Sequence, residues 1–203
     1  MKLYDGGKAP NPRRVDVFVK EKGIDIERVP VDMGALEHRS EKVTALNPLQ
    51  RLPVLELDDG TVLSESVAIC RYLEELYPEP NLFGKTALER AQVEMWSRRV
   101  ELIFLAAVAA AFRHIHPAMA EWEVPQMPEW GEINKPKALA FLQFLNQELA
   151  IRDYVAGDRF TIADITMAIG FDFMKPARIV CPPELANVLE WHARVTARPS
   201  FRR

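Results

Sequence analysis

The spacing of apolar residues over the first 78 positions alternates between the strand period and the helix period. Residues 2–4 predict a short strand, and alternating apolar residues predict a second strand over 26–33. Between them, apolar residues recur at helical spacing over 11–23. Residues 54–57 and 61–63 then predict a hairpin, and a further helical pattern follows. The predicted order is therefore β-α-β-α-β-β-α.

Turn and capping residues mark the ends of these elements. Asn11 before Pro12 is typical of an N-cap followed by proline at the first helical position. Gly23 is typical of the residue that follows a helix, and Asp59-Gly60 predicts a two-residue hairpin turn. The last helix of this half is predicted from the apolar residues Ile69, Tyr72, Leu73 and Leu76.

Strand patterns stop after residue 78, and helical patterns separated by proline-rich turns take over. Leu139, Leu142, Leu145 and Leu149 repeat in steps of three and four behind Pro136. We expect a first domain over residues 1–78, a stiff linker over 79–86 and an all-helical domain over 87–203. Residues 113–134 contain three prolines and two tryptophans, and a long connection of this kind is often functional.

Composition and charge exclude several classes of function. The chain has 203 residues, 48% of them hydrophobic and 27% charged, with a net charge of −3, so it lacks the basic footprint of a nucleic-acid-binding protein. The most apolar run, 102–112, is about half the length that spans a bilayer. The first residues lack the apolar run of a secretion signal, and two cysteines form no disulfide framework, so we expect a cytoplasmic protein without a membrane partner.

The segment that precedes the hairpin is the first candidate binding feature. Pro53 cannot donate to a sheet ladder, so it must begin the strand or lie at its edge. If the Leu52–Pro53 peptide is cis, Leu52 can offer both its N–H and its C=O to an extended, peptide-like ligand. The alternative is a proline that only starts a strand.

Glu65 and Ser66 precede the last helix of the first half and form a second candidate feature. A helix N-terminus has unpaired N–H groups and a partial positive charge, which favour a carboxylate, and the Ser66 hydroxyl adds a donor. Glu65 is able to pair with an ammonium group, so the two residues match an α-amino-acid head group. The alternative is simple capping of the helix by Ser64.

Thr161 and Asp164 have the spacing of a capping box, and Phe160 and Ile165 that of a hydrophobic staple. We interpret this feature as structural: it predicts the start of a buried helix.

Together, Leu52-Pro53-Val54, Glu65-Ser66 and the Thr161…Asp164 box resemble the cytosolic glutathione transferases over essentially the whole chain. Residues 55–61 and Glu129-Trp130-Gly131 are most similar to a fungal and bacterial subgroup, typified by the second yeast glutathione transferase. The resemblance implies a thioredoxin-like α/β N-terminal domain and an all-α C-terminal domain. It also implies glutathione as co-substrate, and a homodimer in which Glu101 approaches the partner's γ-glutamyl ammonium group.

The resemblance further implies a glutathione-binding set. Leu52, which precedes Pro53, would bind the cysteinyl backbone, and Glu65 with Ser66 would bind the γ-glutamyl head. His38 would reach the glycyl carboxylate, which Arg51 would also approach. The alternative for His38 is a solvated loop histidine.

The group that activates the thiol is open at this point, because residues 6–14 contain no Ser, Thr, Tyr or Cys. Asn11 at the helix N-terminus can donate an amide N–H to sulfur, or only cap the helix; Tyr4 is a rival donor, or part of the sheet core. The subgroup's serine and histidine positions correspond to Ala109 and Arg113. Arg113 is able to stabilise the thiolate as a fixed cation, with His114 and His116 as alternatives, or to be a solvated charge.

The electrophile is expected to bind among the 104–134 side chains Phe112, Met119, Trp122 and Trp130, unless these form core. Four histidines show no metal-ligand spacing, so no metal is expected. Cys70 is expected in packing and Cys181 in a loop, and the missing junction thiol excludes mixed-disulfide chemistry there.

The function predicted from these observations is a detoxifying glutathione S-transferase that conjugates the glutathione thiolate to hydrophobic electrophiles. Two alternatives are a glutathione-dependent peroxide or disulfide reductase, and a non-catalytic glutathione- or ligand-binding module on the same fold.

Overall fold

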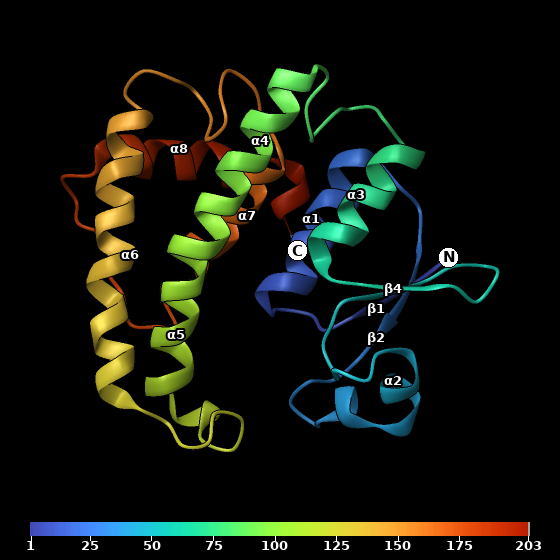
Figure 1. The fold of residues 1–203 in the computed structure, drawn as a ribbon. Helices are drawn as coiled ribbons and strands as arrows, with labels where there is room; N and C mark the ends of the chain where they lie inside the picture. Colours follow the sequence, from blue (N-terminus) through green and yellow to red (C-terminus); the bar gives the residue numbers. More distant parts are fainter. Residues whose placement is uncertain (203) are drawn as a thin grey trace. The chain divides into compact units, whose positions relative to one another are not determined.

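The computed structural model describes residues 1–202, which divide into two compact units, Met1–Asn81 and Leu82–Arg202 (Figure 1). Each unit is described by itself below.

The first unit contains a four-stranded sheet in the order β2-β1-β3-β4. Its strands are β1 (Lys2–Asp5), β2 (Glu27–Pro30), β3 (Val54–Glu56) and β4 (Val62–Ser64). β1 pairs parallel with β2 and antiparallel with β3, which pairs antiparallel with β4. The helices are α1 (Pro10–Lys22), α2 (Glu41–Leu46) and α3 (Ser66–Leu76), with a 3₁₀ turn, η1, at Glu37–Arg39. The predicted β-α-β-α-β-β-α order is confirmed.

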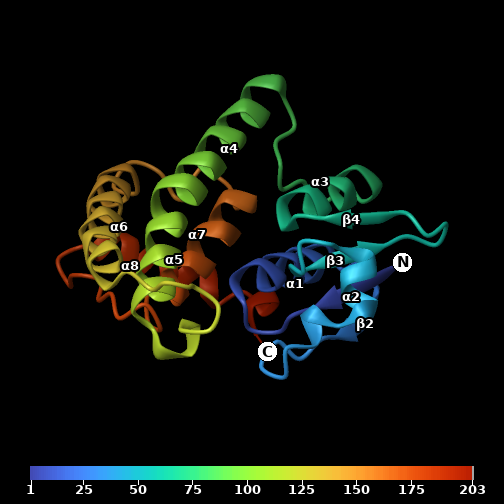
Figure 2. The same ribbon diagram turned by 60° about the horizontal axis from the view of Figure 1, so that its bottom comes forward.

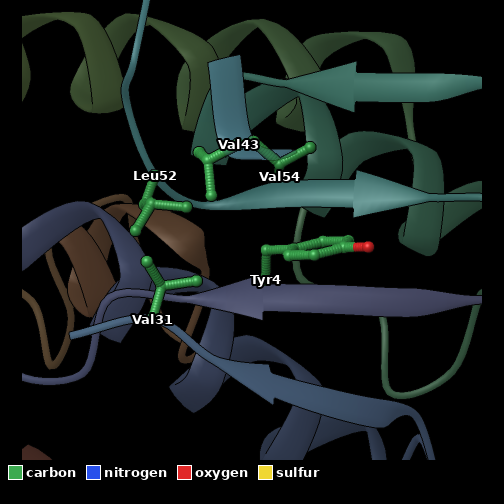
Figure 3. Packing of buried hydrophobic residues seen from close by; sticks show 5 residues of the cluster. All are labelled: Tyr4, Val31, Val43, Leu52 and Val54. Carbon is green, nitrogen blue, oxygen red and sulfur yellow. The ribbon is translucent and has the colours of Figure 1, made fainter. Parts of the chain in front are cut away.

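The sheet of the first unit separates two layers of apolar side chains. Tyr4, Val31, Val43, Leu52 and Val54 form one cluster, in which Val43 comes from α2 (Figure 3). The neighbours of Tyr4 and Val54 along their strands, Leu3 and Leu55, are fully buried and face the other side, because successive strand residues alternate. Figure 1 shows α1 and α3 side by side on that second side.

Three local expectations about the first unit were wrong. α1 begins at Pro10 with Ala9 as its N-cap, so Asn11 lies inside the first turn rather than at the cap. The second strand ends at Pro30 instead of continuing to residue 33, because Asp32 Oδ1 accepts the N–H groups of the two residues at 34 and 35 and turns the chain. The hairpin loop has three residues, 58–60, because Leu57 N–H donates to Thr61 O at 2.8 Å.

The positions of the turn-forming glycines agree with the sequence. Gly23 has a φ of 62° at the end of α1, the left-handed conformation that ends many helices. Gly60 has a φ of 84° as the last residue of the three-residue loop, where the Asp59 side chain accepts the Thr61 N–H at 2.8 Å.

A buried lysine holds the segment that follows α3. Lys22 Nζ, at the end of α1, lies 2.5 Å from Glu74 Oε2 and donates to the carbonyls of Tyr77 at 2.6 Å and Pro80 at 2.9 Å. Glu74 in turn accepts from Asn81 Nδ2 at 2.8 Å. These bonds anchor the last residues of the first unit against α1 and α3.

The second unit is helical over its described residues (Figure 2). Its α-helices are α4 (Ala87–Arg99), α5 (Ala106–Ile115), α6 (Pro128–Glu148), α7 (Ile162–Phe173) and α8 (Ala186–Thr196). A π-helical segment, η2 (Val100–Leu105), joins α4 to α5, and the 3₁₀ turns η3 and η4 lie at Pro117–Met119 and Pro199–Phe201. Of the 113–134 stretch, the last residues belong to α6, which begins at Pro128 and contains Pro136. Over residues 1–202, no helix is both long and apolar enough to cross a membrane.

α7 is the central helix of the second unit, since Ile162–Gly170 are all buried. The predicted capping box is confirmed at its start: Asp164 Oδ2 accepts the Thr161 N–H at 2.9 Å and the Thr161 hydroxyl at 3.2 Å. Its other oxygen accepts the Val155 N–H at 2.9 Å and the indole N–H of Trp191, from α8, at 3.0 Å. One buried carboxylate therefore links α7, α8 and the preceding loop.

Candidate functional site

The Leu52–Pro53 peptide is cis, and it immediately precedes β3. The Leu52 side chain is buried in the cluster of Figure 3, while no hydrogen bond within residues 1–202 occupies its backbone N–H or C=O. Buried Asn47 holds the preceding loop from inside: its amide donates to Arg51 O at 2.9 Å and accepts the Leu49 N–H at 3.2 Å. The arrangement leaves one complete backbone donor–acceptor pair for an extended peptide ligand.

Glu65 and Ser66 form the beginning of α3. Glu65 is the N-cap with a φ of 68°, so the alternative, simple capping of this helix by Ser64, was wrong. Its side chain is exposed and makes no capping hydrogen bond, while Ser66 is buried. A non-glycine residue with a positive φ is uncommon and marks a position where the surrounding fold fixes the backbone.

Arg14 is a site residue that the sequence reasoning missed. The residue is 2% exposed, and its guanidinium Nη1 donates to Ser66 Oγ at 2.6 Å and to Asn11 Oδ1 at 3.4 Å. The available signal was its spacing: Arg14, Phe18 and Lys22 recur every four residues on the buried face of α1. Arg14 places a permanent cation at the N-terminus of α3, where an anionic ligand group is already favoured.

His38 lies in the 3₁₀ turn η1 and is 1% exposed, so the alternative of a solvated loop histidine was wrong. Burial lowers the pKa of His38, and the nearby charges of Arg39 and Arg51 lower it further. His38 is therefore a neutral imidazole at neutral pH. The other candidate for the glycyl carboxylate, Arg51, lies on the cis-proline loop and is exposed.

Asn11 and Ser66 lie close together because the Arg14 guanidinium donates to both side chains. Tyr4, the rival candidate for activating the thiol, lies elsewhere in the unit and has another partner. Tyr4 is buried in the sheet cluster, and its hydroxyl donates to Glu56 Oε2 at 2.9 Å. Burial first, and the Glu56 carboxylate second, raise the pKa of Tyr4. Asn11 is exposed, with its side-chain oxygen turned toward Arg14.

The basic and histidine candidates of the second unit occupy the end of α5. Arg113 is exposed, and its carbonyl accepts from Gln126 Nε2 at 2.7 Å. His114 Nδ1 accepts the Met127 N–H at 3.1 Å, and His116 Nδ1 accepts the Ala118 N–H at 3.2 Å. Both histidines therefore hold the α5–α6 connection through their ring nitrogens.

The aromatic candidates of the second unit belong to different local contacts. The Phe112 ring lies 4.8 Å from the rings of both His116 and Phe173. The Trp122 N–H donates to Met119 O at 2.9 Å, so these two residues share one turn. Trp130, on α6, is 49% exposed and lies under the Lys137 ammonium group, 4.7 Å from the ring centre.

Both cysteines are free thiols. Cys70 is fully buried in α3, and burial raises the pKa of its thiol to about 12. Burial also raises the pKa of Cys181, whose thiol contacts the Pro182 carbonyl. Over residues 1–202, no group of three or more potential metal ligands occurs.

The fold and the cis-proline loop define a two-domain protein with a thioredoxin-like unit followed in sequence by an all-helical unit. Residues 9–76 match the family model of the glutathione S-transferase N-terminal domain, and residues 98–199 match that of the C-terminal domain. The chain belongs to the glutathione S-transferase family.

Individual relatives agree with the family assignment. The chain is 36% identical to glutathione S-transferase 2 of Saccharomyces cerevisiae, over 100% of this chain and 88% of that protein. It is 30% identical to glutathione S-transferase 3 of Zea mays, over 100% of this chain and 92% of that protein.

Solved structures agree as well. A crystal structure of a glutathione S-transferase domain-containing protein from Marinobacter aquaeolei has a TM-score of 0.94 and 41% identity, covering 100% of both chains. The crystal structure of Gtt2 from S. cerevisiae has a TM-score of 0.92 and 36% identity, covering 98% of both chains.

Proposed function

We propose that this chain binds glutathione in its first unit and transfers the glutathione sulfur, as a thiolate, to hydrophobic electrophiles. The observation that carries the proposal is the backbone of Leu52. Its N–H and C=O precede a cis-proline and make no hydrogen bond within residues 1–202. A peptide ligand paired there adds one extended residue to the loop, as strand addition does in other peptide-binding folds.

In this proposal the cysteinyl residue of glutathione pairs with the backbone of Leu52. Other residues bind the γ-glutamyl and glycyl ends of glutathione. Ser66 and the N-terminus of α3 receive the γ-glutamyl carboxylate, with the Arg14 guanidinium behind the serine hydroxyl. Glu65, which is exposed, pairs with the γ-glutamyl ammonium group. His38 and Arg51 take the glycyl carboxylate, and the neutral His38 acts as a hydrogen-bond donor rather than a cation.

Two groups are proposed to favour the thiolate. Asn11, in the first turn of α1, offers an amide N–H, because Arg14 already engages its side-chain oxygen. The partial positive charge at the start of α1 acts in the same direction. Arg113 is the second candidate, as an exposed cation on the helical unit.

On the helical unit, we assign the electrophile to Phe112, Met119, Trp122 and Trp130. Support comes from their residue types and partial exposure: aromatic and thioether side chains accept apolar molecules of varied shape. Residues 1–78 would serve glutathione, residues 79–86 would be the linker and residues 87–203 would serve the electrophile. A cytoplasmic role in detoxification is consistent with this activity.

The proposal includes a homodimer. Leu88, Met95 and Leu102 recur every seven residues along α4 and η2, and the first and last are 70% and 65% exposed. Such a regular exposed apolar stripe suits a helix of a second copy of this chain. Glu101, beside the stripe, bonds Arg98 and is the residue proposed to approach the partner's γ-glutamyl ammonium group. Light scattering that gives a stable monomer at micromolar concentration would contradict the dimer.

Turnover with two substrate classes tests the proposed reaction. Purified protein is assayed with glutathione and an aryl chloride, and separately with an organic hydroperoxide. Faster turnover of the aryl chloride supports transfer. Hydroperoxide turnover alone would instead identify a reductase, and binding of glutathione without either activity would identify a binding module.

A further inference from the structure

Helices α1 and α3 of the first unit lie side by side and meet through two pairs of buried polar residues (Figure 1). Arg14 of α1 donates to Ser66 of α3, and about two helical turns further on Lys22 of α1 meets Glu74 of α3. The Lys22–Glu74 pair joins opposite charges, whereas Arg14 meets a neutral hydroxyl at the first residue of α3. The two pairs therefore differ in chemistry, although both join the same helices.

One nitrogen of the Arg14 guanidinium reaches two side chains of the proposed glutathione site. Nη1 donates to Ser66 Oγ at 2.6 Å and to Asn11 Oδ1 at 3.4 Å. A terminal guanidinium nitrogen carries two hydrogens, so each bond uses one of them. Arginine has no acceptor atom and keeps its proton in proteins, so it is the donor in both bonds. The directions of the two bonds are therefore fixed by the chemistry of Arg14.

The first bond decides how Ser66 is able to meet a ligand. A serine hydroxyl donates one hydrogen and also accepts hydrogen bonds. Because Arg14 only donates, the Ser66 oxygen accepts from it, and the hydroxyl hydrogen is left for another partner. Over residues 1–202, this hydroxyl makes no second hydrogen bond. Ser66 therefore has a donor to offer, and a ligand carboxylate at the N-terminus of α3 is a suitable acceptor.

The second bond decides which way the Asn11 amide faces. Rotation exchanges the oxygen and the NH₂ group of an asparagine, and only the oxygen accepts a hydrogen bond. Arg14 Nη1 therefore attracts Oδ1 and turns Nδ2 away from itself. In the described part of the chain, Asn11 makes no other side-chain hydrogen bond. At 3.4 Å the bond is longer than the usual length of about 2.9–3.0 Å, so Arg14 orients Asn11 less strongly than Ser66.

We propose that Arg14 is a positioning residue for the glutathione site, which presents the Ser66 hydroxyl to the γ-glutamyl carboxylate and the Asn11 amide N–H to the sulfur. The inference rests on the proposed function and adds to it a residue that acts through two others. Burial supports the role, because at 2% exposure little water reaches Arg14 to compete for its two acceptors. A permanent cation also keeps both orientations the same over the pH range in which a thiol ionises.

Arg14→Met tests the role at Ser66, because it removes both hydrogen bonds and keeps an apolar side chain between the helices. Calorimetry is expected to show glutathione binding weakened about five- to thirtyfold, which is the loss expected for Ser66→Ala. In the double variant with Ser66→Ala the two losses should not multiply, because both substitutions remove the same contact. Losses that multiply in full would mean that Arg14 acts without Ser66, and they would overturn the inference.

Arg14→Lys separates the two effects and keeps a cation between the helices. Its single Nζ is expected to donate to Ser66, the nearer acceptor, and to leave the Asn11 amide free to rotate. The affinity for glutathione should stay within about threefold of the wild type, while kcat with an aryl chloride falls about two- to fivefold. If Arg14→Met does not fold, this split carries the test. Lower affinity with wild-type kcat, or no change in either, would overturn the inference.

The matched control is Lys22→Met combined with Glu74→Gln, which removes the other polar pair between the same helices. It should lower Tm but leave affinity and kcat within about twofold, because both residues lie toward the other ends of α1 and α3. Losses in the control equal to those in Arg14→Met would reduce Arg14 to helix packing and overturn the inference with glutathione binding intact. If the wild type itself does not bind glutathione, the proposed function is wrong and the inference falls with it.

Discussion

Asp164→Asn is expected to destabilise the helical unit strongly, because its carboxylate accepts four hydrogen bonds in a fully buried position. One oxygen accepts from Val155 N–H and Trp191 Nε1, and the other accepts from the Thr161 N–H and hydroxyl. An asparagine side chain has only one accepting oxygen, so its NH₂ group faces either Val155 N–H and Trp191 Nε1 or the Thr161 N–H and hydroxyl, of which the hydroxyl is able to turn and accept. One or two hydrogen bonds are therefore lost, depending on the orientation.

The magnitude follows from the number of bonds lost. Each hydrogen bond to a charged group contributes about 1.5–3 kcal/mol, so the loss of one or two is about 1.5–6 kcal/mol. Unfolding free energies of whole proteins are about 5–15 kcal/mol. For a chain of this length, each kcal/mol lowers Tm by about 2–4 °C, which gives a decrease of about 3–24 °C.

Thermal and denaturant unfolding measure the effect, with Asp172→Asn as the matched control. Asp172 lies on the same helix but is partly exposed, with His192 as a partner at 2.8 Å, so its substitution should cost no more than about 1 kcal/mol. Burial raises the pKa of Asp164 to about 6, so the comparison is made well above that pH, where the carboxylate is ionised. If the Tm of Asp164→Asn equals that of Asp172→Asn, the hydrogen-bond account of Asp164 is wrong.

Three further predictions concern the first unit. Ser66→Ala should weaken glutathione binding by about 1–2 kcal/mol, and an unchanged calorimetric Kd would remove Ser66 from the site. Asn11→Ala should lower turnover about ten- to a hundredfold, or about 1.4–2.7 kcal/mol, and leave the affinity for glutathione within a few-fold. If Asn11→Ala keeps wild-type turnover while Arg113→Ala loses it, the activating group lies on the helical unit. His38→Gln should reduce the acid sensitivity of folding. Because burial lowers the pKa of His38, the stability that its neutral form provides is present above the ordinary value of 6.5 and is lost as pH falls through the folded-state pKa. Parallel denaturation curves of wild type and variant from neutral to mildly acidic pH would contradict this.

Local signals predicted most elements of the fold. Gly23 ends α1 in the left-handed conformation, and Thr161 with Asp164 starts α7, because both features depend on residues close together in sequence. The hairpin was located correctly around Asp59-Gly60, but its length was not, because the turn has Gly60 as the third loop residue rather than the second of two. The predicted start of α1 came later than the observed one, because Pro10, as well as Pro12, is acceptable in the first turn of a helix.

Contacts between distant parts of the chain were the ones that sequence reasoning missed. Arg14 meets Ser66 across 52 residues, and Lys22 meets Glu74 across the same number. A pattern analysis assigns basic residues to the solvated face of a helix, whereas these two are buried with polar partners on α3. The Glu74 carboxylate compensates the charge of Lys22, and the Ser66 hydroxyl accepts a hydrogen bond from Arg14. Trp191 meets Asp164 for a similar reason, since α8 reaches α7 only through the tertiary fold.

The thiol pKa of bound glutathione tests the central claim most directly. The ultraviolet absorbance of the thiolate is followed against pH with saturating protein, and again with the Ser66→Ala variant at raised concentration. The account predicts that the apparent pKa falls from the ordinary thiol value of about 8.5 to about 7 or below in both. Glutathione that binds with its thiol pKa unchanged, or that fails to bind at all, would contradict a transferase that works through the thiolate.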